Sequence, residues 1–119
     1  LFVGFIEIVT VFFIENNHKS KELREMLNAE YPELLRKDKI NNTTIKSSFY
    51  PEDWRAGSIF RFVTLDNNIK YSIEIDKKLS DKYPDFGEIA RGGVVLNKNR
   101  GSDTLLVKDG NKEYLFLID

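Results

Sequence analysis

The segment FYPEDWRAG, at Phe49–Gly57, holds the densest group of side chains in this chain that could do chemistry. Its adjacent carboxylates, Glu52 and Asp53, could in principle transfer protons or hold a cation. However, neighbours in sequence do not set the carboxyl separation of about 5–9.5 Å that glycoside hydrolysis requires, and no partner base accompanies them. The segment therefore does not predict an active site.

The same segment suits contacts with a ligand or with another protein better. Trp, Tyr and Arg are the side chains that most often anchor protein interfaces. The candidate interaction residues are Tyr50, Glu52, Trp54 and Arg55. Two alternatives stay open, namely a small-ligand site on this loop and a structural role in which Trp54 covers one end of a β-barrel.

A second candidate region, GEIARGGVVLNKNRGSD at Gly87–Asp103, is rich in glycine. Backbone N–H groups of glycine-rich turns can hold anions. The spacing matches neither a P-loop nor a dinucleotide-binding motif, however, and no helix is expected to follow. Glycines that allow tight turns and a bulge explain the pattern better. Arg91 and Arg100 remain candidate interaction residues, as a basic edge for an acidic partner, a small anion or a glycan.

The composition excludes several kinds of chemistry. The chain has no cysteine and one histidine, His18, which excludes disulfides and a cysteine nucleophile and leaves almost no basis for a zinc site. There is also no Ser–His–Asp arrangement for nucleophilic catalysis. The net charge of −1 provides no broad attraction to nucleic acid. We therefore predict no enzyme activity, no cofactor, no catalytic or metal-ligating residue and no nucleic-acid partner.

The elements that carry these residues begin with an apolar segment, LFVGFIEIVTVFFI, at residues 1–14. Eleven of its residues are strongly apolar. A helix of this length would be about 21 Å long, whereas the hydrocarbon core of a bilayer is about 30 Å thick. We therefore predict that residues 1–14 are the C-terminal part of a membrane-spanning helix, which makes a membrane the first predicted partner.

Glu7 is the one charged residue inside this apolar segment. A charge at the centre of a bilayer costs about 2.5–3.5 kcal/mol, while each Leu, Ile, Phe or Val returns about 0.3–0.6 kcal/mol, so the segment can carry one carboxylate. Such a carboxylate usually faces a partner helix, so Glu7 is a predicted intramembrane contact. The alternative, favoured by the β-branched run Ile8–Val11, is that residues 1–14 form a buried strand of a soluble β-rich domain.

Residues 15–39 predict a charged helix followed by a linker. Ser20–Tyr31 is rich in helix-forming residues, and Pro32 ends the helix. Four apolar side chains share one stripe at helical spacing, namely Leu23, Met26, Leu27 and Tyr31. This stripe predicts packing of the helix through one face.

Residues 40–119 predict an antiparallel β domain. Turn-forming residues separate two pairs of apolar runs, Ser58–Leu65 from Ile69–Ile75 and Thr104–Val107 from Glu113–Ile118. Further strands are expected near Thr44–Tyr50 and Gly93–Leu96. Five or six short strands are typical of a small barrel or a rolled sheet. The predicted fold class is therefore α+β, with an N-terminal apolar helix and a charged helix before the β domain.

Alternation along the second strand of the first hairpin predicts its two faces. The residues expected in the core are Ile69, Tyr71, Ile73 and Ile75, and those expected in solvent are Lys70, Ser72 and Glu74. The first strand alternates less cleanly, with apolar residues at Ile59, Phe60, Phe62 and Val63. That strand is expected to be covered on both faces.

Several short segments resemble a known family. They are YPELL at Tyr31–Leu35, Lys37 followed by Ile40-Asn41, FGEI at Phe86–Ile89, SDTLLV at Ser102–Val107 and DGNKEYLF at Asp109–Phe116. In these segments the chain resembles small single-pass, membrane-anchored envelope proteins of Bacteroidetes-type bacteria. The resemblance implies a membrane tether and an extracytoplasmic (periplasmic) β domain, and it implies no functional residues.

Two functions follow as hypotheses. The first is a non-enzymatic, membrane-tethered accessory subunit whose β domain contacts a larger envelope protein complex. The second is a β module that binds a small anion or a glycan, through the Phe49–Gly57 loop or through Arg91 and Arg100.

Overall fold

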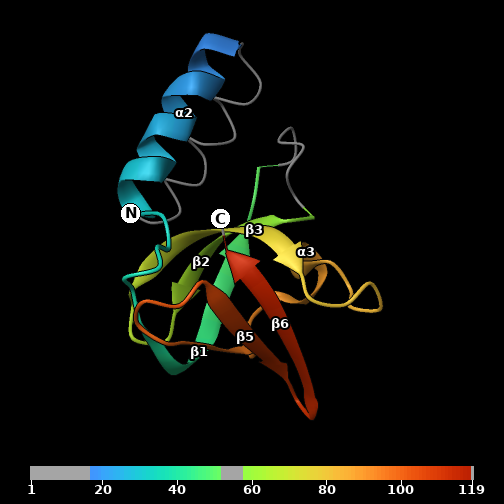
Figure 1. Cartoon of the computed structure of the whole chain (residues 1–119). Helices are drawn as coiled ribbons and strands as arrows, with labels where there is room; N and C mark the ends of the chain where they lie inside the picture. Colours follow the sequence, from blue (N-terminus) through green and yellow to red (C-terminus); the bar gives the residue numbers. More distant parts are fainter. Residues whose placement is uncertain (1–16, 52–57, 119) are drawn as a thin grey trace. The chain divides into compact units, whose positions relative to one another are not determined.

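A computed structural model describes residues 17–51 and 58–118 (Figure 1). The chain divides into two units, Leu1–Glu30 and Tyr31–Asp119. The predicted membrane segment, with Glu7, lies outside the described residues. None of the helices in the described ranges combines the length and the apolar character that crossing a bilayer requires.

The described part of the first unit is helix α2, Asn17–Glu30. It confirms the predicted charged helix, and the chain leaves the helix just before Pro32, whose ring disfavours helical backbone at the preceding residue. Leu23 and Leu27 of the predicted stripe are buried, whereas Met26 is 41% exposed. The packing face is therefore narrower than the predicted stripe.

Six strands make up most of the second unit. Their bounds are β1 Ile40–Phe49, β2 Phe60–Leu65, β3 Lys70–Lys78, β4 Val95–Lys98, β5 Thr104–Asp109 and β6 Lys112–Ile118. They close into a ring in the order β1-β2-β3-β6-β5-β4, and every neighbouring pair is antiparallel (Figure 1). The predicted antiparallel β domain of five or six strands is thus confirmed.

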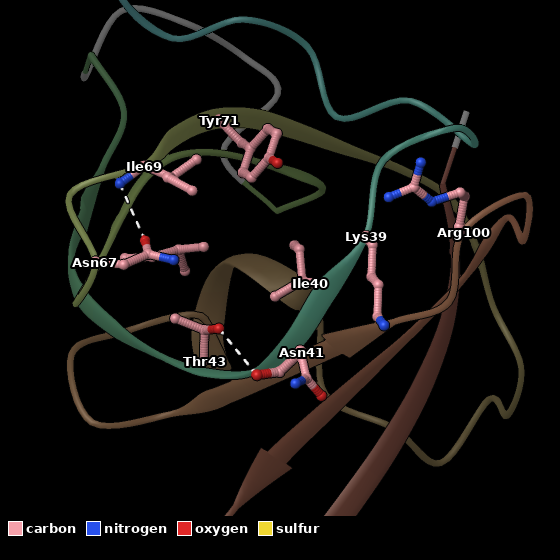
Figure 2. Close-up of a pocket in the computed structure, with 9 residues that line it drawn as sticks. Lys39, Ile40, Asn41, Thr43, Asn67, Ile69, Tyr71 and Arg100 are labelled. Carbon is pink, nitrogen blue, oxygen red and sulfur yellow. Dashed lines mark hydrogen bonds between the residues drawn. The ribbon is translucent and has the colours of Figure 1, made fainter.

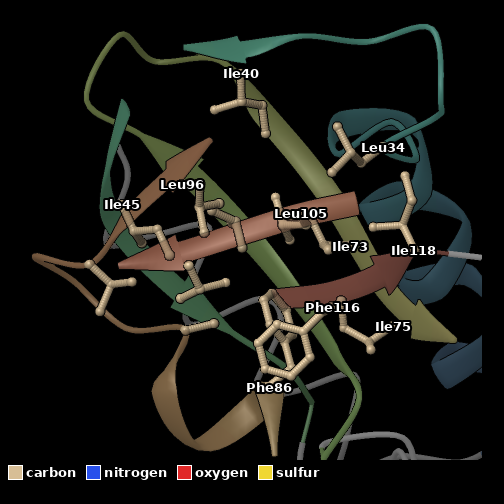
Figure 3. Packing of buried hydrophobic residues seen from close by; sticks show 14 of the residues in the cluster. Leu34, Ile40, Ile45, Ile73, Ile75, Phe86, Leu96, Leu105, Phe116 and Ile118 are labelled. Atoms are coloured by element: carbon tan, nitrogen blue, oxygen red, sulfur yellow. The ribbon is translucent and has the colours of Figure 1, made fainter. Parts of the chain in front are cut away.

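The core lies inside this ring of strands. Alternate residues point inward, as the pleat of a strand requires, and Leu96, Leu105 and Phe116 are fully buried there (Figure 3). The neighbours Phe62 and Val63 are both fully buried. This confirms that β2 is covered on both faces.

An aromatic group covers the outward side of β2. Phe62 lies 5.2 Å from Tyr31 and 5.3 Å from Phe49, measured between ring centroids. Tyr31 and Phe49 also meet edge to face at 5.7 Å, one of the geometries that aromatic pairs prefer. The residues just before β1 are thereby tied to the ring.

The segment Pro32–Leu34 fills a gap in the ring. β6 pairs only with the second half of β3, from Ile75 onward. Beside the first half, the Leu34 N–H donates to the Ser72 carbonyl at 2.9 Å, and the Ser72 N–H donates to the Pro32 carbonyl at 2.9 Å. The Leu34 side chain enters the core with 2% exposure. The prediction that Ser72 faces solvent is therefore wrong, since it is 7% exposed.

The β2–β3 turn confirms the first predicted hairpin but corrects one face assignment. The Leu65 N–H donates to the Ile69 carbonyl at 2.9 Å, and Asn68 takes a left-handed conformation with φ 67°. Asn tolerates this conformation because its short polar side chain can bond locally. Ile69 therefore belongs to the turn and is 48% exposed, so its predicted place in the core is wrong.

A short helix, α3 (Phe86–Ile89), lies between β3 and β4, where the sequence pattern predicted no helix. Phe86 and Ile89 are buried, and the Phe86 ring meets Phe116 at 5.6 Å. One turn of helix is too short to show a helical period, which explains why the pattern did not predict it. The helix places apolar side chains against the core at the end of the ring where β6 begins.

Candidate functional site

A pocket lies at the end of the ring where β1 begins and β2 passes into β3. Its volume is about 340 Å³, which falls in the range of about 300–1,000 Å³ typical of small-ligand sites. Figure 2 shows it with its lining side chains. They are Lys39, Ile40, Asn41, Thr43, Leu65, Asn67, Ile69, Tyr71 and Arg100.

The inner part of the pocket is apolar. Ile40 and Leu65 are each 2% exposed and belong to the core. The Tyr71 side chain is half-buried and packs against the same core. The exposed Ile69 continues this apolar surface outward. The pocket therefore offers a ligand an apolar wall backed by the core.

Neutral polar groups lie along the rim. The Asn67 Oδ1 accepts the Ile69 N–H at 3.1 Å, which leaves the amide nitrogen of Asn67 able to donate to a ligand. The Thr43 hydroxyl donates to the Asn41 carbonyl at 3.1 Å, so its oxygen keeps lone pairs that can accept. Both hydrogen bonds, each between residues two apart in the sequence, hold their side chains in place (Figure 2).

Two cations stand together on one side of the pocket. Figure 2 shows Lys39 and Arg100 opposite Asn67 and Ile69. Both cations are exposed, and within the described residues neither takes part in an ion pair. Asp38 adds one negative charge nearby, with its Oδ2 accepting the Leu35 N–H at 2.9 Å, and the two cations outnumber it. The rim is therefore a positive edge above an apolar wall.

Tyr71 supplies a neutral donor. Burial raises the pKa of its phenol above the ordinary value of 10.0, and the negative charge of Asp38 raises it further. Both causes disfavour the phenolate. The Tyr71 O–H therefore remains protonated and can donate to an anionic or polar ligand.

The cationic side of the pocket is built from two segments far apart in the sequence. The Gly101 N–H donates to the Arg36 carbonyl at 2.6 Å, and the Arg36 guanidinium reaches back to the Gly101 carbonyl at 3.5 Å. Gly101 has φ 83°, a left-handed conformation that glycine adopts without steric cost. Residues 36–39 and 98–101 thus form one joined corner, which we call the basic corner.

Lys98 is the buried residue of the basic corner. Its side chain is 1% exposed, and its ammonium donates to the carbonyls of Arg36, Asp38 and Asn99 at 2.6, 2.6 and 3.1 Å. Burial lowers the pKa of Lys98 from the ordinary 10.5, and the negative charges of Asp38 and Asp103 oppose that effect. The three hydrogen bonds are those of the ammonium form, which has three donors and no acceptor.

The candidate residues from the sequence do not gather at one place. Arg100 lines the pocket. Arg91 lies at the opposite end of β4, where its guanidinium pairs with the Asp109 carboxylate at 3.0 Å. The structure therefore does not bring Arg91 and Arg100 into one basic edge.

Tyr50 lies away from the pocket. The Arg61 guanidinium packs over its ring, 4.1 Å from the ring centroid. Arg61 also donates to the Phe60 and Gly87 carbonyls, so it joins β2 to α3. Glu52, Trp54 and Arg55 lie outside the described residues, and the predicted interaction loop stays a prediction.

Sequence reasoning missed most of the pocket. The residues that it did not name as site residues are Lys39, Ile40, Asn41, Thr43, Leu65, Asn67, Ile69 and Tyr71. Only the Asp66-Asn67-Asn68 turn carried a signal, and that signal was read as hairpin chemistry. A lone lysine beside the start of a strand carries none.

The side chains that line the pocket are suited to binding a ligand. Within residues 17–51 and 58–118, no cluster of three His, Asp or Glu side chains could hold a metal ion. The lining supplies two cations, two amides, two hydroxyls and an apolar wall. This arrangement can hold a small molecule that carries negative charge on one side and apolar surface on the other.

Comparison with protein-family models, with curated proteins and with solved structures found no match to this chain. The site geometry therefore carries the functional argument by itself.

Proposed function

We propose that the ring of strands is a binding module that holds a small anion in the pocket beside Lys39 and Arg100. The observation that carries this proposal is the placement of these two cations, without ion-pair partners in the described chain, over a pocket of about 340 Å³ with an apolar wall. The preferred ligand is a phosphate or carboxylate joined to an apolar or ring-shaped part.

The charge at the pocket supports an anion over a neutral ligand. A guanidinium offers a planar fork that fits phosphate and carboxylate, and an ammonium adds a compact positive charge. Arg100 and Lys39 supply one of each. A hydrogen bond to a charged group contributes about 1.5–3 kcal/mol, which corresponds to roughly tenfold or more in affinity.

The remaining lining supports a ligand larger than an inorganic ion. The Tyr71 ring with Ile40 and Ile69 can cover one face of a ring-shaped group. The Asn67 amide and the Tyr71 hydroxyl can donate to its oxygens. A phosphate monoester or a carboxylate attached to a ring would use both halves of the pocket, whereas inorganic phosphate would use only the cationic side.

A titration followed by amide NMR tests this proposal on the full chain. Phenyl phosphate should shift the amides of residues 39–43, 66–71 and 99–101 in a saturable way. Lys39→Gln and Arg100→Gln should each weaken binding about tenfold, from loss of a charge-assisted hydrogen bond. Arg91→Gln is the matched control, because it removes an arginine that pairs with Asp109 away from the pocket.

Two further probes separate the alternatives. Phenol has the ring without the charge, and a neutral oligosaccharide represents a glycan ligand. If phenol or the oligosaccharide binds as tightly as phenyl phosphate, and the two glutamine variants bind normally, the anion proposal is wrong.

We also propose, from the sequence, that the chain is a membrane-tethered accessory subunit of an envelope complex. The apolar composition of residues 1–14 supports the tether, and the resemblance to envelope proteins supports the location. The test is flotation of the full chain with liposomes and co-migration in detergent extracts of its natural host. A chain that stays in the aqueous fraction and never migrates with a larger species would contradict this second proposal.

A further inference from the structure

Lys98 is the one charged residue among the fully buried side chains of the described chain. Lysine is almost never fully buried unless its charge is compensated. Within residues 17–51 and 58–118, Lys98 forms no ion pair. Its compensation comes from three main-chain carbonyls.

The three carbonyls belong to two separate segments. Arg36 and Asp38 lie before β1, and Asn99 lies directly after β4. The distances of 2.6, 2.6 and 3.1 Å use all three donors of the ammonium. The Lys98 ammonium is therefore a cross-link between the two halves of the basic corner.

Each of these segments is followed in the sequence by one of the two cationic residues that line the pocket. Lys39 follows Asp38, and Arg100 follows Asn99. We infer that Lys98 is the positioning residue of the pocket: its buried ammonium, on the carbonyls of Arg36, Asp38 and Asn99, holds the two segments so that Lys39 and Arg100 face the same ligand. This inference rests on the anion site proposed above.

The β1–β4 ladder, which pairs Ile40 with Lys98, also joins these two segments, but it does not include Asp38 or Asn99, the residues next to the pocket cations. The Arg36 guanidinium is exposed and its 3.5 Å contact with the Gly101 carbonyl is long. The Gly101 N–H bond to the Arg36 carbonyl joins the same segments but does not reach Asp38, the residue next to Lys39. A methionine at position 98 would be one atom shorter than lysine and would leave the Asp38 and Asn99 carbonyls without the Lys98 donor, while the Arg36 carbonyl would keep the Gly101 N–H.

The wild-type chain gives the first test. A buried ammonium that donates to three carbonyls exchanges its protons slowly, so ¹H–¹⁵N correlation of lysine side chains should show a persistent Lys98 signal with couplings across hydrogen bonds to carbonyl carbons. Exposed lysines should give no such signal. A Lys98 ammonium that exchanges as fast as the others would overturn the inference, and this test does not depend on any variant folding.

The second test compares Lys98→Met with Lys77→Met, a control that removes an exposed lysine from β3. In Lys98→Met, exchange of the Gly101 amide should quicken about tenfold or more, while amides of the β5–β6 hairpin keep their rates. The dissociation constant for phenyl phosphate should rise about tenfold or more, although Lys39 and Arg100 remain. The control should change neither value.

A third variant separates positioning from general damage. Lys98→Ala opens space beside the three carbonyls, and added methylammonium should restore both Gly101 protection and phenyl phosphate affinity. Tetramethylammonium, which has no N–H donor, should not. Faster exchange throughout the ring, with no rescue by methylammonium, would overturn the inference.

The outcomes distinguish this inference from the proposed function. If wild type does not bind phenyl phosphate at all, the anion proposal fails, while the ammonium signal and Gly101 exchange still report on the cross-link. If Lys98→Met loosens Gly101 yet binds phenyl phosphate as wild type does, the pocket proposal stands and the positioning role of Lys98 is refuted.

Discussion

The main-chain N–H of Gly101 donates to the carbonyl of Arg36 at 2.6 Å. This hydrogen bond joins the residues before β1 to the loop between β4 and β5. Lys39 and Arg100 both line the pocket because these segments are joined there. The pocket is therefore a product of ring closure and does not exist in any single hairpin.

Reversing the charge of Arg100 should abolish binding with little effect on stability. Arg100 is exposed, and surface substitutions usually change the free energy of unfolding by no more than about 0.5 kcal/mol. Arg100→Glu would place a carboxylate beside an anionic ligand, so we expect no measurable phenyl phosphate binding and an unchanged urea midpoint. Calorimetric titration and urea unfolding measure the two quantities. Wild-type affinity in Arg100→Glu would exclude Arg100 from the site.

Ionic strength should act on the same interaction. Exposed charges are screened over a Debye length of about 10 Å at 0.1 M salt and about 3 Å at 1 M. We therefore expect phenyl phosphate affinity to fall steadily as sodium chloride is raised, and the slope to be smaller in Lys39→Gln. A control titration in which choline chloride replaces sodium chloride excludes a specific sodium effect. Affinity that is independent of salt would indicate apolar binding only.

Leu34 and Leu35 form a matched pair for testing the segment that fills the gap beside β3. Leu34 is 2% exposed within the core, whereas Leu35 is 40% exposed. Leu34→Ala should lower the free energy of unfolding by about 2–5 kcal/mol, the usual cost of truncating a buried leucine. Leu35→Ala should change it by less than about 0.5 kcal/mol. Equal effects in denaturant unfolding would show that Pro32–Leu34 is not part of the folded ring.

Tyr71 should make stability fall at alkaline pH. Its folded pKa is raised, first by burial and then by Asp38, so its contribution is complete below the unfolded pKa of about 10 and is lost as pH rises through the higher folded value. The slope of stability against pH above about 10 should therefore be less negative in Tyr71→Phe. Urea unfolding across this range measures the slope. An identical slope in both proteins would show that folding does not raise the pKa of the Tyr71 phenol.

Local patterns predicted the strands well because turn chemistry marks them. Asp66-Asn67-Asn68 and Asp109-Gly110 each sit between apolar runs, and Asn68 and Gly110 take the left-handed conformations, φ 67° and 63°, that such turns require. The order of strands around the ring could not be predicted from local patterns, because the pairing of β3 with β6 and of β1 with β4 depends on contacts distant in the sequence.

The wrong assignments share one cause. Ser72 follows the solvent-facing alternation, but Pro32–Leu34 pairs with β3 at that point and covers it. Ile69 follows the core alternation, but the turn ends there and leaves it exposed. Periodicity describes one strand at a time, and neither the covering segment nor the strand end is visible in it.

The sequence did not predict the pocket, because local patterns do not show which distant segments come together. The pocket draws on residues 39–43, on the β2–β3 turn and on Arg100, which share no motif. Lys98 is the clearest case, because a lysine at the end of a short strand normally points to water. Its burial follows from three carbonyls that only the closed ring brings together.

The dissociation constant of phenyl phosphate, measured by calorimetry for the full wild-type chain and for Lys39→Gln/Arg100→Gln, tests the central claim most directly. We predict saturable binding to wild type and a loss of about a hundredfold or more in the double variant, since each cation contributes roughly tenfold. Equal affinity in the two proteins, or no binding to wild type, would contradict the claim that this pocket is an anion site.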